Sequence, residues 1–116
     1  MFGGVVPAST GVGIAPPRGA AVVGGFLAVE PLSERARVLA VPSPLQCPAI
    51  DYRSAFSRAV EVSGAGRRHL YVSGTASIDP QGASTCRGDV DGQIRTTLAV
   101  VEALLASRGM AWGDTR

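Results

Sequence analysis

One long helical pattern near the end of this 116-residue chain limits the folds that are open to it. Apolar residues recur there at intervals of three or four, namely at Val90, Ile94, Leu98, Val101 and Leu105. This spacing places them on one face of an α-helix. Asp89 precedes the pattern as a capping residue, and Gly109 follows it as a typical helix end. The sequence therefore predicts one amphipathic helix of about 20 residues, whose apolar face must pack against another element.

A β-hairpin is predicted before the helix. Residues 56–62 and residues 69–74 each alternate between two kinds of side chain, and the turn that separates them contains two glycines. Two alternating runs around such a turn are typical of a hairpin. We expect the helix to pack on this hairpin, so that its apolar face covers Val60, Leu70 and Val72. A mixed α+β domain follows from these elements.

The first part of the chain is predicted to contribute further β-structure. Residues 20–29 are apolar with a glycine interruption, which indicates a buried strand, and residues 36–41 form a second β-like run. The segment Pro42–Ala49 contains three prolines, so it is an extended connector and not a helix or a central strand. We therefore predict three parts: a β-rich segment at 1–41, a proline-rich connector at 42–53 and a hairpin–helix unit at 54–116.

A cluster of small polar residues follows the second strand of the hairpin. Residues 70–77 read Leu-Tyr-Val-Ser-Gly-Thr-Ala-Ser. A strand that ends in this way exposes backbone N–H groups and hydroxyls with little side-chain bulk, which suits a small anionic or carbonyl ligand. The same residues are also the usual composition of a turn between strands. Both interpretations remain open on these residues alone.

Composition excludes several classes of function. The chain has a net charge of only +2, and its eleven basic residues, all arginine, are scattered among nine acids, which argues against a nucleic-acid surface. One histidine and two distant cysteines give no metal-ligand spacing, so we expect no metal and reduced thiols. The longest apolar run, residues 19–29, is too short to span a bilayer. We expect a cytoplasmic protein without membrane or nucleic-acid partners.

Four blocks of residues resemble the Rid family of reactive intermediate deaminases, also called the YjgF or RidA-like family. They are Phe56-Ser-Arg-Ala-Val60, Leu70-Tyr-Val-Ser-Gly74, Gly88-Asp-Val-Asp-Gly-Gln93 and Ser107-Arg-Gly109 running to Gly113-Asp114. The blocks occur in the family's order over about sixty residues. The resemblance extends over residues 42–114, where Pro42–Gln46 and Ser73–Ser77 are most similar to two-domain, chorismatase-like members.

The resemblance implies a chorismate-mutase-like (RidA-like) α/β fold, assembled as a homotrimer with ligand pockets at the subunit interfaces. It implies a small carboxylate substrate and no cofactor. Ser73 and Gly74 match the strand end that lines the family's pocket. Thr75 and Ala76 stand where the family has other residues in that wall, and Phe56 stands where it often has tyrosine. We expect these five residues to bind substrate; no catalytic residue is identified.

The match also implies a fragment. The chain ends before the strands in which the family carries its carboxylate-binding arginine, and residues 11–32 resemble the closing strands of a preceding Rid-like half. Three functions follow as hypotheses. The first is a hydrolase, or deaminase, that converts enamine or imine intermediates to a ketoacid and ammonia. The second is a chorismatase-like enzyme that releases pyruvate from chorismate. The third is a non-catalytic binding or oligomerisation module.

Overall fold

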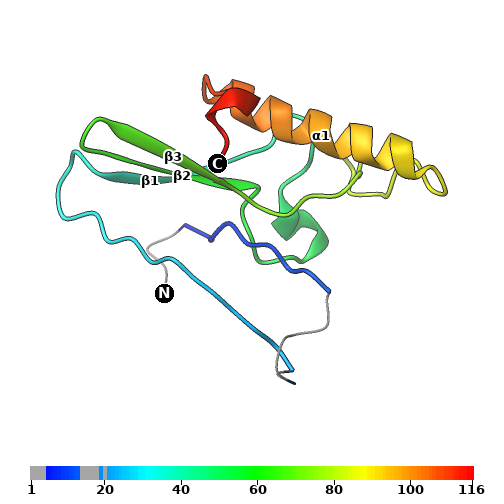
Figure 1. Cartoon of the computed structure of the whole chain (residues 1–116), viewed down its shortest axis with the longest axis horizontal. Coiled ribbons are helices and arrows are strands. Elements are labelled where there is room, and N and C mark those ends of the chain that lie inside the picture. Colours follow the sequence, from blue (N-terminus) through cyan, green and yellow to red (C-terminus); the bar gives the residue numbers. More distant parts are fainter. Residues whose placement is uncertain (1–4, 14–18, 20) are drawn as a thin grey trace.

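The computed structural model describes residues 5–13, 19 and 21–116; the other residues of the predicted segment 1–41 lie outside the described part. Its strands are β1 (Arg37–Val41), β2 (Ala59–Gly64) and β3 (Arg67–Val72), its helix is α1 (Val90–Ser107), and its 3-10 turns are η2 (Ala49–Tyr52) and η3 (Trp112–Asp114). The strands form one antiparallel sheet in the order β1-β2-β3, and α1 lies along one face of it (Figure 1). The predicted mixed α+β class, with a hairpin and one long helix, is confirmed. No helix in the described part is long and apolar enough to cross a membrane.

The hairpin turn has the geometry that its sequence predicts. Ala65 and Gly66 connect β2 to β3, and both have positive φ angles, 49° and 75°. Positive φ at both central residues is typical of the two-residue turn that matches the twist of paired strands. Glycine adopts this conformation without strain, which explains its place at position 66. The strands begin two to three residues away from the predicted bounds, but the hairpin itself is confirmed.

The face of the hairpin that meets the helix differs from our expectation. The register pairs Ala59 with Val72 and Val60 with Tyr71, so Val60 lies on the face opposite Val72. The core consists of Val41, Ala59, Val100 and Leu104, with Leu70 and Val72 packed against it. The prediction that Val60 lies under the helix is therefore wrong. The small side chain of Ala59 gives α1 a flat surface on which to pack, and the bulk of Val60 faces the other way.

Helix α1 begins and ends where the sequence predicts. The Asp89 carboxylate accepts a hydrogen bond of 2.9 Å from the backbone N–H of Gly92, which satisfies one of the free donors of the first turn. At the other end the chain leaves the helix through Gly109, whose φ of 66° is a conformation that glycine favours after a helix.

The predicted apolar stripe of α1 is buried only near its C-terminal end. Leu105 is buried and Val101 is half-buried, but Val90, Ile94 and Leu98 are 66, 52 and 49% exposed. The buried residues of the helix are Gly92, Val100, Leu104 and Leu105. In the second half of the helix, Val100 and Leu104 face the core, and each lies one residue before a predicted position. The buried side of α1 is therefore shifted by about one residue from the predicted stripe.

Residues before β1 do not form the strand predicted over 20–29. Residues 21–30 belong to no strand, and Figure 1 shows them as an extended chain that runs outside the sheet. The prediction of a buried strand over 20–29 is thus wrong for its described residues. The β-run at 36–41 is confirmed as β1, which pairs with β2 across the proline-rich segment. That segment therefore joins two strands of one sheet.

Candidate functional site

Ser73 and Gly74, the first two residues of the predicted ligand-binding strand end, are hydrogen-bonded to residues 5–13 of the same chain. The buried Ser73 hydroxyl donates to the Ser57 carbonyl and accepts from the Ser9 N–H at 2.9 Å. The N–H of Gly74 donates to the Ser9 carbonyl at 3.2 Å and to the Thr10 hydroxyl at 2.8 Å. The donors that we expected to face a ligand are therefore occupied by residues 5–13.

The other two residues of the strand end are bonded to the proline-rich segment. Gln46, which is only 5% exposed, accepts a hydrogen bond of 2.9 Å from the Thr75 hydroxyl. Its amide donates to the Ala76 carbonyl at 2.8 Å. One buried glutamine thus fixes both residues, and sequence reasoning missed it. A polar residue between prolines, followed by strand-end hydroxyls, is the signal that could have identified it.

Phe56 contacts a buried arginine. The Arg58 guanidinium lies 5.3 Å from the ring centre of Tyr52 and 5.6 Å from that of Phe56. It donates two hydrogen bonds, of 2.9 and 2.8 Å, to the Cys47 carbonyl. Arg58 is 5% exposed and forms no ion pair with a carboxylate in the described part of the chain. Phe56 therefore supports this cation, which ties the connector to the start of β2.

A small hollow of about 470 Å³ opens beside Ala76, between the loop after β3 and α1. Its lining comprises Ala76, Ser77, Ser84, Val90, Gln93, Ile94, Thr97 and Leu98. Of the five predicted site residues, only Ala76 lies in it. The lining carries hydroxyls and one amide but no ionisable side chain, so the hollow by itself has no general acid or base.

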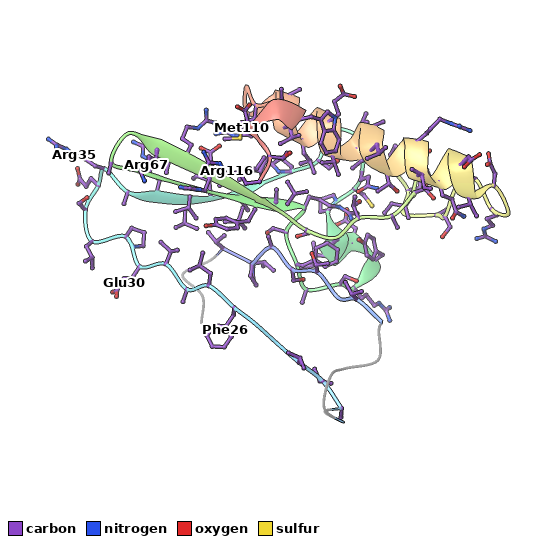
Figure 2. All side chains as sticks on the ribbon, in the orientation of Figure 1. Phe26, Glu30, Arg35, Arg67, Met110 and Arg116 are labelled. Atoms are coloured by element: carbon purple, nitrogen blue, oxygen red, sulfur yellow. The ribbon has the colours of Figure 1, made fainter. Side chains whose placement is uncertain are left out.

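A larger groove of about 950 Å³ follows the outer edge of β3, beneath the C-terminal half of α1. Its apolar lining is provided by Leu70, Val72, Val101 and Leu105. Arg67 and Arg116 contribute positive charge, and Asp114 contributes one carboxylate. Figure 2 labels Arg67 at the hairpin, and it labels Met110 and Arg116 in the chain after the helix. The groove thus combines an apolar surface with a basic rim, and no part of it was predicted from the sequence.

The backbone of β3 is unpaired along this groove. In antiparallel strands, residues that exchange both backbone hydrogen bonds alternate with residues that exchange none. The two-residue turn makes Gly64 and Arg67 a bonded pair, and bonded pairs recur at every second residue of β3. The N–H and C=O groups of Arg68, Leu70 and Val72 therefore point away from β2. Because β3 is the last strand of the sheet, these groups have no partner strand within the described residues.

A buried carboxylate fixes the helix over this edge. Glu61 on β2 accepts hydrogen bonds of 2.7 Å from Arg108 and 2.8 Å from Arg68, and Arg68 also donates to the Arg108 carbonyl. The hydrogen bonds from Arg108 and then Arg68 lower the pKa of Glu61 from 4.5 to about 2, against the opposing effect of burial. The ion pairs connect β2, β3 and the end of α1 at one end of the groove.

Glycine at position 74 is required by the close approach of the N-terminal segment. A Cβ atom added there would lie 2.8 Å from Thr10 Cγ2 and 3.3 Å from its hydroxyl oxygen. We expect Gly74→Ala to displace residues 5–13, so that the Ser9 amide, now bonded to Ser73, exchanges its hydrogen faster. Hydrogen exchange followed by NMR measures this, and Gly113→Ala is the matched control because nothing lies near that Cβ. Unchanged protection of the Ser9 amide would contradict the contact.

Comparison of the chain with protein-family models, with curated proteins and with solved structures finds no match. In the described part, no group of three or more His, Cys, Asp or Glu side chains is placed to hold a metal ion, and both cysteines are free thiols.

Proposed function

We propose that this chain is a binding and oligomerisation module that accepts an additional β-strand along β3. The observation that carries the proposal is the outward-facing backbone of Arg68, Leu70 and Val72 beside a groove of about 950 Å³. An exposed strand edge binds an extended peptide through main-chain hydrogen bonds, and neighbouring pockets select its side chains. Here the pockets are apolar, because Val101 and Leu105 of α1 overhang the edge.

The position of α1 favours strand addition at the edge of β3 over the opposite edge of the sheet, which belongs to β1. Proteins commonly protect sheet edges with charges, prolines or a covering segment. The edge of β3 has arginines at the turn, but its middle residues, Leu70 and Val72, are half-buried and continuous with the core. An added strand would extend this apolar surface under α1 and cover the exposed side of the core.

Hydrogen exchange of the β3 amides tests the proposal. The amides of His69 and Tyr71 bond to β2 and should be protected at any protein concentration. The amides of Arg68, Leu70 and Val72 should exchange rapidly in dilute samples and become protected as the chain associates at higher concentration. Both sets of amides lie on β3. Unfolding would therefore speed the exchange of both sets, whereas strand addition changes only the exchange of the outward set. If the outward amides stay unprotected in an associated sample, or the chain never associates, the proposal is wrong.

A Rid-like hydrolase is the second candidate, and the hollow beside Ala76 favours it. The Thr97 hydroxyl and the second N–H of the Gln93 amide are suited to hydrogen-bond a small carboxylate, whereas the Ser77 hydroxyl already donates to the Thr85 carbonyl. Water would add to the imine carbon, the C–N bond would break, and ammonia would leave with the transferred proton. Because the hollow contains no ionisable group, the acid or base must come from a neighbouring subunit, as in a cytoplasmic trimer with interfacial pockets.

An enzymatic assay separates the catalytic candidates from the binding module. The associated chain is mixed with serine and a serine dehydratase, which generates the enamine, and ketoacid formation is followed. Acceleration over the dehydratase alone would support the hydrolase. A parallel sample with chorismate tests the chorismatase-like alternative through pyruvate release. If neither the ketoacid nor pyruvate appears faster than in a control that lacks this chain, both enzymatic candidates are excluded and the binding module is the remaining function.

A further inference from the structure

We infer that the strand accepted along β3 is residues 21–29 of a neighbouring copy of this chain; the inference rests on the proposed binding function. This segment, called the arm below, is extended and lies outside the sheet. Its larger apolar side chains are exposed to an unusual degree: Val22 by 82%, Val23 by 69%, Phe26 by 99%, Leu27 by 67% and Val29 by 44%. Figure 2 shows Phe26 projecting from the arm, away from the sheet.

The arm has the composition and length of the missing strand. Valine and phenylalanine favour strands, and the arm contains no charged residue. Its nine residues are sufficient to pair with the six residues of β3, and Pro31 ends the run two positions later. Gly24 and Gly25 have nothing within 4 Å of a Cβ position, so close packing in the single chain does not require them. Glycines allow a backbone to approach another closely, as in a groove.

Charge also matches the arm to the groove. The only charged residues between positions 21 and 34 are Glu30 and Glu34, which follow the arm. The groove is lined by Arg67, Arg68 and Arg116 against the one carboxylate of Asp114, so its lining is net positive, and neither Arg67 nor Arg116 forms an ion pair within the described residues. An arm in the groove would therefore bring acidic residues toward a basic rim. Such pairs orient a complex and add little affinity, so the affinity must come from the apolar side chains.

The arm belongs to a neighbouring copy because the single chain holds it clear of the groove. It leads into β1, the edge of the sheet opposite β3, and runs on the side away from α1 (Figure 1). Exchange in which each copy donates one arm and accepts another uses every arm and every groove once when the copies close into a ring. Because the side chains of a strand alternate between its two faces, each contact then buries one face of the arm, such as Val22 and Phe26, against Leu70, Val101 and Leu105 of the next copy.

Two variants with complementary defects test this exchange. Phe26→Asp combined with Leu27→Asp charges the arm and leaves the groove intact. Val101→Arg fills the groove and leaves the arm intact, and it breaks no hydrogen bond of the sheet. We expect each variant alone to weaken association by about 100-fold or more, because a carboxylate or guanidinium would be buried without a partner. Leu32→Asp is the control: Leu32 is 88% exposed but lies beyond the arm, so association should be unchanged.

The mixture of the two variants distinguishes the possible occupants. If the arm of one copy binds the groove of another, the mixture forms a one-to-one pair by sedimentation, because one intact arm meets one intact groove. No pairing in the mixture, with the wild type associating, would overturn the inference. If the charged-arm variant still associates and its β3 amides remain protected, a different strand occupies the edge, so the inference fails and the proposed function survives. If those amides are unprotected in the wild type at every concentration, both fail. Circular dichroism of each variant verifies that it is folded.

Discussion

Leu104→Ala is expected to lower the free energy of unfolding by about 3 kcal/mol, which is a large part of the stability of a small domain. Leu104 is 1% exposed and packs with Val41, Ala59 and Val100 at the centre of the core. Truncation removes three carbons and leaves a cavity, because strands β1 and β2 cannot close it without losing their pairing. Urea denaturation followed by circular dichroism measures the change.

The matched control for this substitution lies on the same helix. Leu98→Ala makes the same chemical change at a side chain that is 49% exposed. Since alanine also has the higher helix propensity, we expect a loss below about 1 kcal/mol. Equal losses at the two positions would show that the core is not centred on Leu104.

Glu61→Gln is expected to destabilise the fold by about 2 kcal/mol at neutral pH. The fall in the pKa of Glu61 from 4.5 to about 2 corresponds to about 3 kcal/mol at most. Because the side chains of Arg68 and Arg108 remain 44 and 32% exposed, solvent screens the ion pairs and reduces that contribution. Glutamine keeps the size of the side chain, so the change isolates the charge. Denaturant titration at neutral pH measures the difference, with Glu102→Gln on the exposed surface of α1 as control.

The same carboxylate sets a dependence of stability on pH. The pKa of Glu61 is lower in the folded chain than in the unfolded chain, so the folded state favours the charged form. Its contribution is complete above about pH 4.5 and is lost as the pH falls toward 2. The stability difference between wild type and Glu61→Gln should therefore shrink across this range. A difference that stays constant down to pH 2 would contradict the role of the charge.

Local features of this fold were predictable from the sequence because neighbouring residues determine them. The Asp89 cap, the end of α1 at Gly109 and the hairpin turn at Ala65-Gly66 each depend on a few consecutive residues. Their chemistry is independent of the rest of the chain. The long apolar repeat likewise indicated α1, although the repeat did not specify which side meets the sheet.

Features that depend on distant residues were not predictable in the same way. Glu61 interrupts an otherwise apolar face, and its carboxylate is accommodated under the helix by hydrogen bonds from Arg68 and Arg108, which are distant from it in sequence or on another element. The arm reads as a buried strand, yet its burial requires a partner that the single chain does not provide. The candidate site shows the same limit: the small residues 73–76 were expected to face a ligand, and the structure places Gln46, Ser9 and Thr10 on them.

Residues 5–13, which cover Ser73 and Gly74, lower the apparent affinity of any small molecule that binds at this strand end. The Gly74 amide already donates to Ser9 and Thr10, which are tethered to it by the same polypeptide. A tethered group competes as if present at a concentration of the order of millimolar. A free carboxylate would have to displace this internal competitor, so its apparent affinity is set as much by the release of residues 5–13 as by its own contacts.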